Sequence, residues 1–424
     1  MIPLATALAV VRPWGAPLAP ATVSVADALG CVLAAPAPAA LDVPPFANSA
    51  MDGYALRSAD VADAPVTLEV VGRVLAGAAP GGGVGPGQAM RIMTGAPLPT
   101  GADAVCMVER TSGGREDGSG TVVIEGRVEA GENLRGAGGD VRRGEEVLGA
   151  GTLVGATQLA ALLSAGCTTV TVHPRPRVGV VSTGDELVDA GLPLGPAQIY
   201  DSNRPMLLAL AAEAGGSPVD LGRSPDDVDG LTERIGAALP QVDALVLSGG
   251  VSVGDVDVVR MALDRLGGGG ARWMQIAIRP AKPFSCASLR GPGGAVPVFG
   301  LPGNPVSSAV SFELLVRPVL RAMAGHRVTE RARWTARAAE PMRRRPDGRL
   351  HLVRVLLEPA PEGVDGGLPG RAATGWVARP CPGQGSHQIR SMGLADGLAL
   401  VPDGEGMAEG APVEVLVTNP ALIG

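Results

Sequence analysis

The chain has 424 residues, which at roughly 150 residues per domain corresponds to about two to four domains. Hydrophobic residues make up 46% of the chain and charged residues 18%, a balance that excludes an intrinsically disordered protein. The formal net charge of -7 disfavours nucleic-acid binding, which depends on a basic surface.

Cysteine usage and hydropathy indicate where the protein resides. The five cysteines are scattered singly, without a CxxC pair or the pattern of a disulfide framework, so we expect a reducing, cytoplasmic compartment. The N-terminal segment has no basic residue before its short apolar run, so no secretory signal is predicted. The longest uncharged stretch, residues 147–174, is interpreted as a helix followed by a strand and not as a membrane span.

Periodicity and turn residues divide the chain into four kinds of segment. Residues 1–43 are expected to be helical, with ADALGCVLAA (26–35) as the periodic part, and residues 141–173 to contain one amphipathic helix. Between them, residues 44–140 read as short strands separated by glycine and proline, as in a small β domain. From residue 174 to 325 strands alternate with helices, which predicts a parallel sheet covered by helices. Residues 326–424 return to short strands, which predicts a C-terminal β domain.

Polar residues follow three of the strands expected in the α/β segment. They are Ser182, Thr183 and Glu186 after the first, Gly249, Gly250, Ser252 and Asp255 after the second, and Pro302, Gly303, Asn304 and Pro305 after the third. Each loop alone is ordinary turn material. Because ligands bind beyond the carboxyl ends of parallel strands, three such ends together predict a binding site.

Lys282 is the single lysine of the chain and lies three residues after Arg279, in IRPAKPF. A protein that otherwise uses arginine is expected to keep one lysine where a compact ammonium is needed. Two cations near amide-rich loops suit a phosphate or another oxyanion, whereas the nearby carboxylates would repel it unless a hard cation such as Mg²⁺ intervenes. The sequence holds no P-loop motif and no local zinc motif.

Other candidates lie outside the α/β segment. Asp52 stands in NSAMDGYA, where a simple Asp-Gly turn is the alternative interpretation, and Thr94 and Asp140 lie in further loops. The run from Arg343 to Arg345 is interpreted as a solvated face, with contact to an anionic ligand as the alternative.

Nine short motifs occur in a fixed order along the chain. They are PPFANSAMDGYA, RIMTGAPLPTGADAV, GENLRGAGGDV, VGVVSTGDEL, YDSNRPML, LVLSGGVSVGDVDVV, IRPAKPF, GLPGNPVSS and GQGSH. In this order they closely resemble the molybdopterin molybdenumtransferase family, the MoeA-type proteins, which are related to the E domain of gephyrin. The resemblance covers nearly the whole chain.

The resemblance implies a multidomain α/β plus β fold that forms a homodimer. It implies a helical linker and dimerisation domain (1–43 and 141–173), an inserted β domain (44–140), a MogA-like parallel α/β catalytic domain (174–325) and a C-terminal β-barrel (326–424). These boundaries agree with those read from the composition.

The resemblance also implies a reaction. Molybdenum from molybdate is inserted into adenylated molybdopterin with Mg²⁺ or a similar divalent cation, which releases AMP and forms molybdenum cofactor. Molybdopterin adenylyltransferase and apo-molybdoenzymes are the implied pathway partners, and neither nucleic acid nor a membrane is expected. Two alternatives stay open: the adenylyltransferase itself, whose fold the α/β segment resembles, and a scaffold that binds a partner peptide.

Functional residues are carried over from the family motif by motif. The family's acidic positions match Asp52, Asp140, Glu186 and Asp255, and further functional positions match Thr94, Lys282, Pro302, Pro305, Arg354 and Ser386. Of these, Glu186, Asp255 and Asp52 are expected to hold the metal and, with Lys282, to act in catalysis. Arg279 and Ala281 stand where family members commonly have lysine and glycine, which keeps the charge but changes the geometry.

Overall fold

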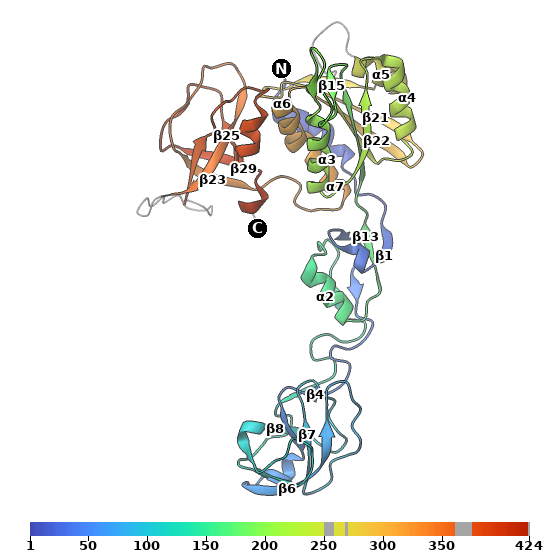
Figure 1. Ribbon diagram of the computed structural model, residues 1–424, viewed down its shortest axis with the longest axis vertical. Coiled ribbons are helices and arrows are strands. Elements are labelled where there is room, and N and C mark those ends of the chain that lie inside the picture. Colours follow the sequence, from blue (N-terminus) through green and yellow to red (C-terminus); the bar gives the residue numbers. More distant parts are fainter. Residues whose placement is uncertain (250–257, 268–269, 361–374, 423–424) are drawn as a thin grey trace. The chain divides into compact units, whose positions relative to one another are not determined.

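The computed structural model describes residues 1–249, 258–267, 270–360 and 375–422. The chain divides into two compact units, one formed by Thr22–Val172 and the other by Met1–Ala21 together with His173–Gly424 (Figure 1). We call them the inserted unit and the main unit. Among the helices in the described ranges, none combines the length and the apolar character needed to cross a membrane.

The inserted unit is built mainly from β-strands. Its larger sheet has the order β8-β5-β7-β6-β10-β9. The strands are β5 (Gly53–Leu56), β6 (Val66–Val74), β7 (Gln88–Ile92), β8 (Ala104–Met107), β9 (Thr111–Ser112) and β10 (Thr121–Ile124). Alternate residues of the strands, such as Leu68 and Val70, face a buried core, as expected for strands with one covered side.

A smaller sheet in this region has the order β1-β13-β2 and lies beside helix α2 (Ala156–Ser164). Its strands are β1 (Ala21–Ser24), β2 (Val32–Leu33) and β13 (Thr169–His173). Two short pairs accompany it, β3 (Ala37–Pro38) with β12 (Glu146–Leu148) and β4 (Asn48–Ser49) with β11 (Leu134–Arg135). The amphipathic helix expected within residues 141–173 is confirmed as α2.

The helix expected over residues 26–35 is wrong. This segment forms one 3-10 turn, η2 (Ala26–Ala28), and then strand β2. Gly30 has a φ of 77°, a left-handed conformation that ends a helix. Beyond it, Cys31 and Leu33 are buried in the core of the smaller sheet, so tertiary packing prevails over the helical periodicity.

The main unit contains a six-stranded sheet of order β17-β14-β18-β22-β21-β19. Its strands are β14 (Arg177–Thr183), β17 (Ser217–Ser224), β18 (Ala244–Ser248), β19 (Arg272–Gln275), β21 (Pro283–Gly291) and β22 (Gly294–Leu301). The first four in the sheet order run parallel, as predicted. The sequence did not reveal that β21 and β19 continue the sheet in antiparallel pairs.

Helices cover both faces of this sheet (Figure 1). They are α1 (Leu4–Val11), α3 (Asn203–Glu213), α4 (Val228–Ala238), α5 (Val258–Gly267), α6 (Pro305–Ser311), the π-helical η5 (Phe312–Val316) and α7 (Arg317–Met323). In β14, Val178 and Val180 pack with the cluster that includes α3 and α6, whereas Val181 packs with α4 and α5. The alternating sides of a strand therefore fill two separate cores.

The C-terminal part of the main unit is a closed barrel. Strands β25 (Leu350–Pro359), β26 (Trp376–Pro380), β23 (Arg333–Ala338), β29 (Pro412–Val417) and β27 (Gly397–Val401) pair in this order, and β27 pairs back with β25. Strand β20 (Ile278–Arg279) joins β25 in parallel. Short strands β24 (Met342–Arg343) and β28 (Gly406–Met407) pair separately, and helix α8 (Ile389–Leu394) follows β26. The predicted C-terminal barrel is confirmed.

A buried ion pair joins the helices to the segment that enters the barrel. Arg331 contacts Glu313 of η5 through two hydrogen bonds of 2.9 and 2.8 Å and also contacts Glu213 at 2.9 Å. The side chains of Glu313 and Arg331 are only 1% and 5% exposed. Burial opposes the charge of Arg331, but the hydrogen bonds and charge of Glu313 outweigh it and raise the pKa of Arg331.

Replacing Arg331 by methionine should destabilise the main unit. The change leaves the Glu313 carboxylate buried, with Arg317 at 3.8 Å as the nearest ion-pair partner among the described residues. The loss of one member of a buried pair costs about 3–5 kcal/mol. All four tryptophans, residues 14, 273, 334 and 376, belong to the main unit, so urea unfolding followed by tryptophan fluorescence reports on this unit alone.

The control is Arg379→Met, which removes an ion pair with Glu358 whose two side chains are both 46% exposed. A surface pair contributes about 0–1 kcal/mol. If both variants lowered the free energy of unfolding equally, the buried ion pair would contribute no more to stability than the exposed one.

Candidate functional site

A cavity of about 900 Å³ opens at the carboxyl ends of β14, β18 and β22. The parallel register aligns Ser182 with Ser248 and Ser248 with Leu301, so the loops after these strands leave the sheet at one edge. Seven of the residues predicted from the sequence line this strand-end cavity: Thr183, Glu186, Gly249, Pro302, Gly303, Asn304 and Pro305. The predicted meeting of the three loops is therefore seen in the structure.

The strand-end cavity is acidic. Glu186, Asp201 and Asp226 line it, and its described lining contains neither arginine nor lysine, while His387 is its one imidazole. No described residue forms a hydrogen bond or an ion pair with the side chain of Glu186 or Asp226. Such carboxylates suit Mg²⁺, which proteins usually hold with one or two carboxylates while substrate phosphates and waters complete the shell. Among the described residues, no group of three or more acidic, histidine or cysteine side chains could hold a metal ion.

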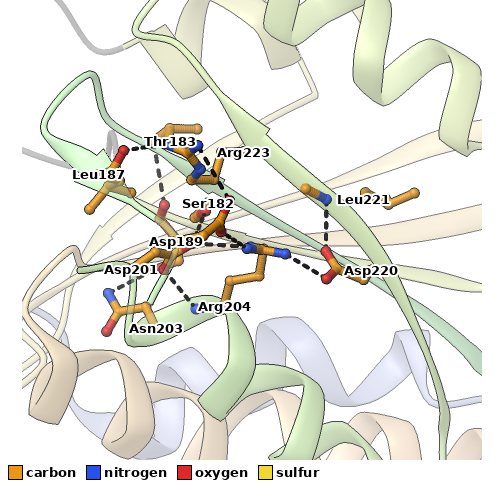
Figure 2. Close-up of polar contacts among 12 residues, drawn as sticks. Ser182, Thr183, Leu187, Asp189, Asp201, Asn203, Arg204, Asp220, Leu221 and Arg223 are labelled. Carbon is orange, nitrogen blue, oxygen red and sulfur yellow. Dashed lines mark hydrogen bonds and ion pairs between the residues drawn. The ribbon is translucent and has the colours of Figure 1, made fainter. Parts of the chain in front are cut away.

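Asp201 anchors the wall of the cavity from within (Figure 2). Its side chain is 1% exposed and accepts hydrogen bonds from Ser182 Oγ at 2.5 Å and from Nε of Arg204 at 3.0 Å. Ser182 is itself fully buried and does not line the cavity. The hydroxyl predicted to bind substrate therefore serves to hold Asp201.

Arg204 links three acidic residues from different segments. Beyond Asp201, its guanidinium pairs with Asp220 of β17 and with Asp189, and Arg223 also contacts Asp189 (Figure 2). Asp189 follows β15 (Leu187–Val188), which pairs with β16 (Ile199–Tyr200). These ion pairs hold the loop that carries Glu186 to the edge of the sheet.

Asn203, the first residue of α3, connects two of the three loops. Its Nδ2 donates to Ser248 Oγ at 2.9 Å and to the carbonyl oxygen of Gly303 at 2.7 Å. Its Oδ1 is buried and accepts no hydrogen bond within the described structure. A single amide side chain thus sets the separation of the loops after β18 and β22.

The backbone conformation at position 249 requires glycine. Its φ is 98°, and a Cβ atom there would lie 2.6 Å from the carbonyl oxygen of Thr183. Its N–H donates to the carbonyl oxygen of Leu301 at 3.1 Å. The close approach of the loops therefore allows only glycine here. The neighbouring predicted residues Gly250, Ser252 and Asp255 lie outside the described residues.

Asp52 and Thr94, which were predicted separately, are in contact in the inserted unit. The backbone N–H of Thr94 donates to Asp52 Oδ1 at 2.7 Å and its hydroxyl at 2.9 Å. These bonds, the backbone bond first, lower the pKa of Asp52, which is an exposed residue. Asp140 is exposed in the same unit, and its N–H donates to the carbonyl oxygen of Val43.

The segment around the single lysine lies between β20 and β21. Arg279 is exposed and lines a second cavity, not the strand-end cavity. Lys282 is half-buried, and its neighbour Pro283 lines the strand-end cavity. Ala281 is buried and has a φ of 78°, so this alanine adopts a backbone conformation that favours glycine, the residue that the resemblance led us to expect here.

Arg354 is a fully buried cation beneath the GQGSH loop. Its side chain donates to Ser391 Oγ at 2.9 Å and to the carbonyl oxygens of Gly383 and Gly385. Its Nη1 has no partner among the described residues, and burial lowers its pKa. Ser386 belongs to the loop that Arg354 supports, and its carbonyl oxygen accepts from the N–H of Val306 at 3.1 Å.

The sequence interpretation assigned no site role to seven polar residues of the described lining: Tyr200, Asp201, Ser202, Asn203, Asp226, Ser248 and His387. Asp226 could have been found, because it comes two residues after β17, a fourth parallel strand whose carboxyl end meets the same edge. Asp201 and Asn203 lie in the motif YDSNRPML, but no periodic pattern places them. His387 comes from the barrel, and only the packing of the barrel on the sheet brings it there.

Comparison with known proteins follows the same division of the chain. Residues 2–166 match the MoeA N-terminal region (domain I and II), residues 179–322 a probable molybdopterin binding domain, and residues 335–418 the MoeA C-terminal region (domain IV). The chain is 36% identical to molybdopterin molybdenumtransferase 2 of Mycobacterium tuberculosis (strain ATCC 25618 / H37Rv) over 396 residues, which is 91% of each protein.

Two further relatives extend the comparison. The molybdopterin molybdenumtransferase of Nostoc sp. is 41% identical over 301 residues, 70% of this chain and 67% of that protein. The crystal structure of the molybdopterin biosynthesis moeA protein from Pyrococcus horikosii superposes with a TM-score of 0.78 at 33% identity, covering 98% of this chain and 99% of that chain. The predicted fold class is confirmed by these matches.

Substituting Gly249 by alanine should disrupt the strand-end cavity and lower the melting temperature of the main unit. The left-handed backbone costs an L-residue about 1–2 kcal/mol, and the contact of the new Cβ with the Thr183 carbonyl adds to this. Gly236→Ala is the matched control, because Gly236 lies within α4 with open space around its Cβ position. That variant should be stabilised by roughly 0.5–1 kcal/mol. An equal change in melting temperature for the two variants would contradict the close contact between position 249 and the Thr183 carbonyl.

Proposed function

This chain belongs to the molybdopterin molybdenumtransferase family, and we propose that it inserts molybdenum from molybdate into adenylated molybdopterin, releasing AMP and forming molybdenum cofactor. The observation that supports this reaction best is the strand-end cavity, where three polar loops meet around unpaired carboxylates. The substrate carries a phosphoanhydride, which needs its negative charge neutralised before the bond between the two phosphates can break.

Glu186 and Asp226 are the proposed metal ligands in the described part of the cavity. Both carboxylates would repel a phosphate unless a cation lay between them, and the chain places neither arginine nor lysine in the described lining. Mg²⁺ bound there would supply positive charge to the phosphate oxygens as AMP leaves. Asp255, from a segment that the structure does not describe, and Asp52, from the inserted unit, are retained as further metal and catalytic candidates on the family resemblance.

Uncharged groups are proposed to position the substrate in the strand-end cavity. Asn203 keeps the loops of Ser248 and Gly303 apart at a set distance, and the rigid Pro302–Gly303–Asn304–Pro305 turn shapes the wall against which the adenylate would lie. The Asp201–Ser182 hydrogen bond holds this wall while the substrate binds. Preorganised groups of this kind lower the cost of orienting a substrate.

The cationic residues are proposed to bind the molybdate. Arg354 is buried without a carboxylate partner among the described residues, and one of its N–H groups is unpaired, so an anion nearby would lower its energy. Lys282 and Ser386 are proposed to act with it, and Arg279 to add charge. In the inserted unit, Thr94 and Asp140 are proposed to bind substrate, which again follows the family resemblance.

Assembly, location and domain boundaries are further proposals. We infer a cytoplasmic homodimer, and the five cysteines, which are all buried and free, support the reducing compartment. The four-domain division at residues 43, 140, 173 and 325 is retained as a prediction, and the adenylyltransferase and apo-molybdoenzymes as pathway partners.

Replacement of Glu186 by glutamine should abolish molybdate-dependent release of AMP. We expect a loss of about 100-fold or more in turnover, the size typical of removing a group that stabilises developing charge. The assay supplies adenylated molybdopterin, Mg²⁺ and molybdate to the purified protein and measures AMP and cofactor. Asp229→Asn is the control, because Asp229 is 84% exposed, pairs with Arg265 and does not line the cavity.

Unchanged turnover of the Glu186→Gln variant would remove this carboxylate from the mechanism. Absence of AMP release by the folded wild-type protein would reject the proposed reaction. Consumption of ATP with formation of adenylated molybdopterin would instead identify an adenylyltransferase, and retention of a bound partner peptide without turnover would identify a scaffold.

Replacement of Asp226 by asparagine should weaken the binding of Mg²⁺ and leave the binding site of the nucleotide intact. With one of two carboxylates removed, the Mg²⁺ concentration that gives half-maximal rate should rise by about tenfold or more, whereas the rate at saturating Mg²⁺ should fall less than in Glu186→Gln. The measurement is a Mg²⁺ titration of AMP release. An unchanged Mg²⁺ dependence would show that Asp226 is not a ligand.

A further inference from the structure

A second cavity of about 570 Å³ lies in the main unit between β20, the segment that includes residues 340–349 and strand β25. We call it the arginine cavity, because its lining includes Arg279, Arg343, Arg344, Arg345 and Arg349. Its described lining holds two carboxylates, those of Glu340 and Asp347. Five guanidinium groups against two carboxylates leave a formal excess of three positive charges, with His351 counted as neutral.

The floor of the arginine cavity is a fixed charge cluster. Asp347 accepts hydrogen bonds from Arg344 at 2.6 Å and from Nε of Arg349 at 2.9 Å, and it contacts the His351 ring at 3.1 Å. The Arg344 side chain is 3% exposed, and it also donates to Asp403 at 2.6 Å. Its Nε is buried without a partner among the described residues. These contacts hold the loop rigid, so the cavity is preformed.

The rim of the cavity carries cations that the described protein leaves unpaired. The side chains of Arg279, Arg343 and Arg345 form no hydrogen bond or ion pair with any described residue, and all three residues are exposed. Burial lowers the pKa of His351, the hydrogen bond and charge of Asp347 oppose this, and the charges of Arg344 and Arg279 lower it further. Like charges gathered in this way repel one another unless an anion lies among them.

The remaining wall is mainly apolar. Apart from Gln384, it consists of Pro280, Pro341, Met342, Leu352, Val353, Pro380 and Val401. A free inorganic oxyanion would gain nothing from such a wall, whereas an organic group covered by it would be removed from water. The volume also lies in the range of sites for small organic molecules, about 300–1,000 Å³.

We propose that the arginine cavity binds a phosphate monoester of a small organic molecule, with the phosphate among the guanidinium groups of the rim and the organic part against the apolar wall. Guanidinium forks match the geometry of phosphate oxygens in two-pronged hydrogen bonds. The site is separate from the strand-end cavity. It shares Arg279 with the residues proposed to bind molybdate, so its test uses Arg343 and Arg345, to which the proposed reaction assigns no role.

The test compares ligands by isothermal titration calorimetry on the full-length protein in EDTA. The probes are AMP, riboflavin 5′-phosphate and inorganic phosphate. At least one ester should bind about tenfold or more tightly than inorganic phosphate, and its affinity should fall with added salt, because the rim charges are exposed. The double variant Arg343→Gln/Arg345→Gln should weaken that ester by about tenfold or more, since two charge-assisted contacts are lost.

Two control variants distinguish binding in the arginine cavity from binding elsewhere on the protein. Arg333→Gln/Arg379→Gln removes the same charge from exposed residues of the barrel that do not line the cavity, and it should bind the ester like the wild type. Glu186→Gln should also retain binding while it loses AMP release, so that a failure of the proposed reaction and a failure of this site can be told apart.

Each remaining outcome overturns the proposal. If neither AMP nor riboflavin 5′-phosphate binds, the proposed site is rejected. Binding of inorganic phosphate as tight as that of both esters rejects a role for the apolar wall. Ester binding that persists in the rim variant, or that is lost equally in the charge-matched control, rejects the rim arginines as its cause.

Discussion

The parallel pairing of β14 with β18 and of β18 with β22 is the constraint on which the candidate site depends. In this pairing the three carboxyl ends leave the sheet together, so loops separated by more than fifty residues in the chain line one cavity. The positive φ of Gly249 and the two hydrogen bonds of Asn203 let these loops approach closely. A change in register of one residue would exchange the faces of the sheet to which Ser182 and Thr183 point.

Electrostatics differ sharply between the two cavities of the main unit. The strand-end cavity has carboxylates and, in its described lining, neither arginine nor lysine, whereas the arginine cavity has an excess of guanidinium groups. Each cavity has a carboxylate held by arginine in its wall: Asp201, whose side chain is 1% exposed, by Arg204, and Asp347, whose side chain is 22% exposed, by Arg344 and Arg349. We propose that these ion pairs make the two walls rigid, and that the unpaired groups above them bind a cation in the strand-end cavity and an anion in the arginine cavity.

Buried arginines also connect the sheet to the barrel. Arg331 joins the helices to the segment that enters the barrel, and Arg354 supports the loop from which His387 reaches the strand-end cavity. Because a buried guanidinium is costly to leave unpaired, each fixes the position of the backbone that supplies its partners. Replacement of Arg354 would therefore act on the shape of the strand-end cavity as well as on stability.

The sequence by itself determined much of the architecture and part of the site. Alternating strands and helices predicted the parallel sheet, and polar residues directly after apolar runs predicted Thr183, Glu186, Gly249 and the loop 302–305 at one edge. These predictions succeed because strand direction and strand ends are local properties that the apolar pattern records. The arginine run 343–345 was visible, but whether it faced solvent or a cavity was not.

Only the tertiary structure decided the rest. Residues 26–35 have helical periodicity, yet Gly30 and the core around Cys31 and Leu33 make them a turn and a strand. Asp201, Asn203 and His387 enter the site, and Ser182 turns away from it, through contacts with residues 19 to 100 positions distant or with another part of the fold. Such contacts leave no periodic trace in the sequence, because they depend on how separate elements pack and not on the neighbours of each residue.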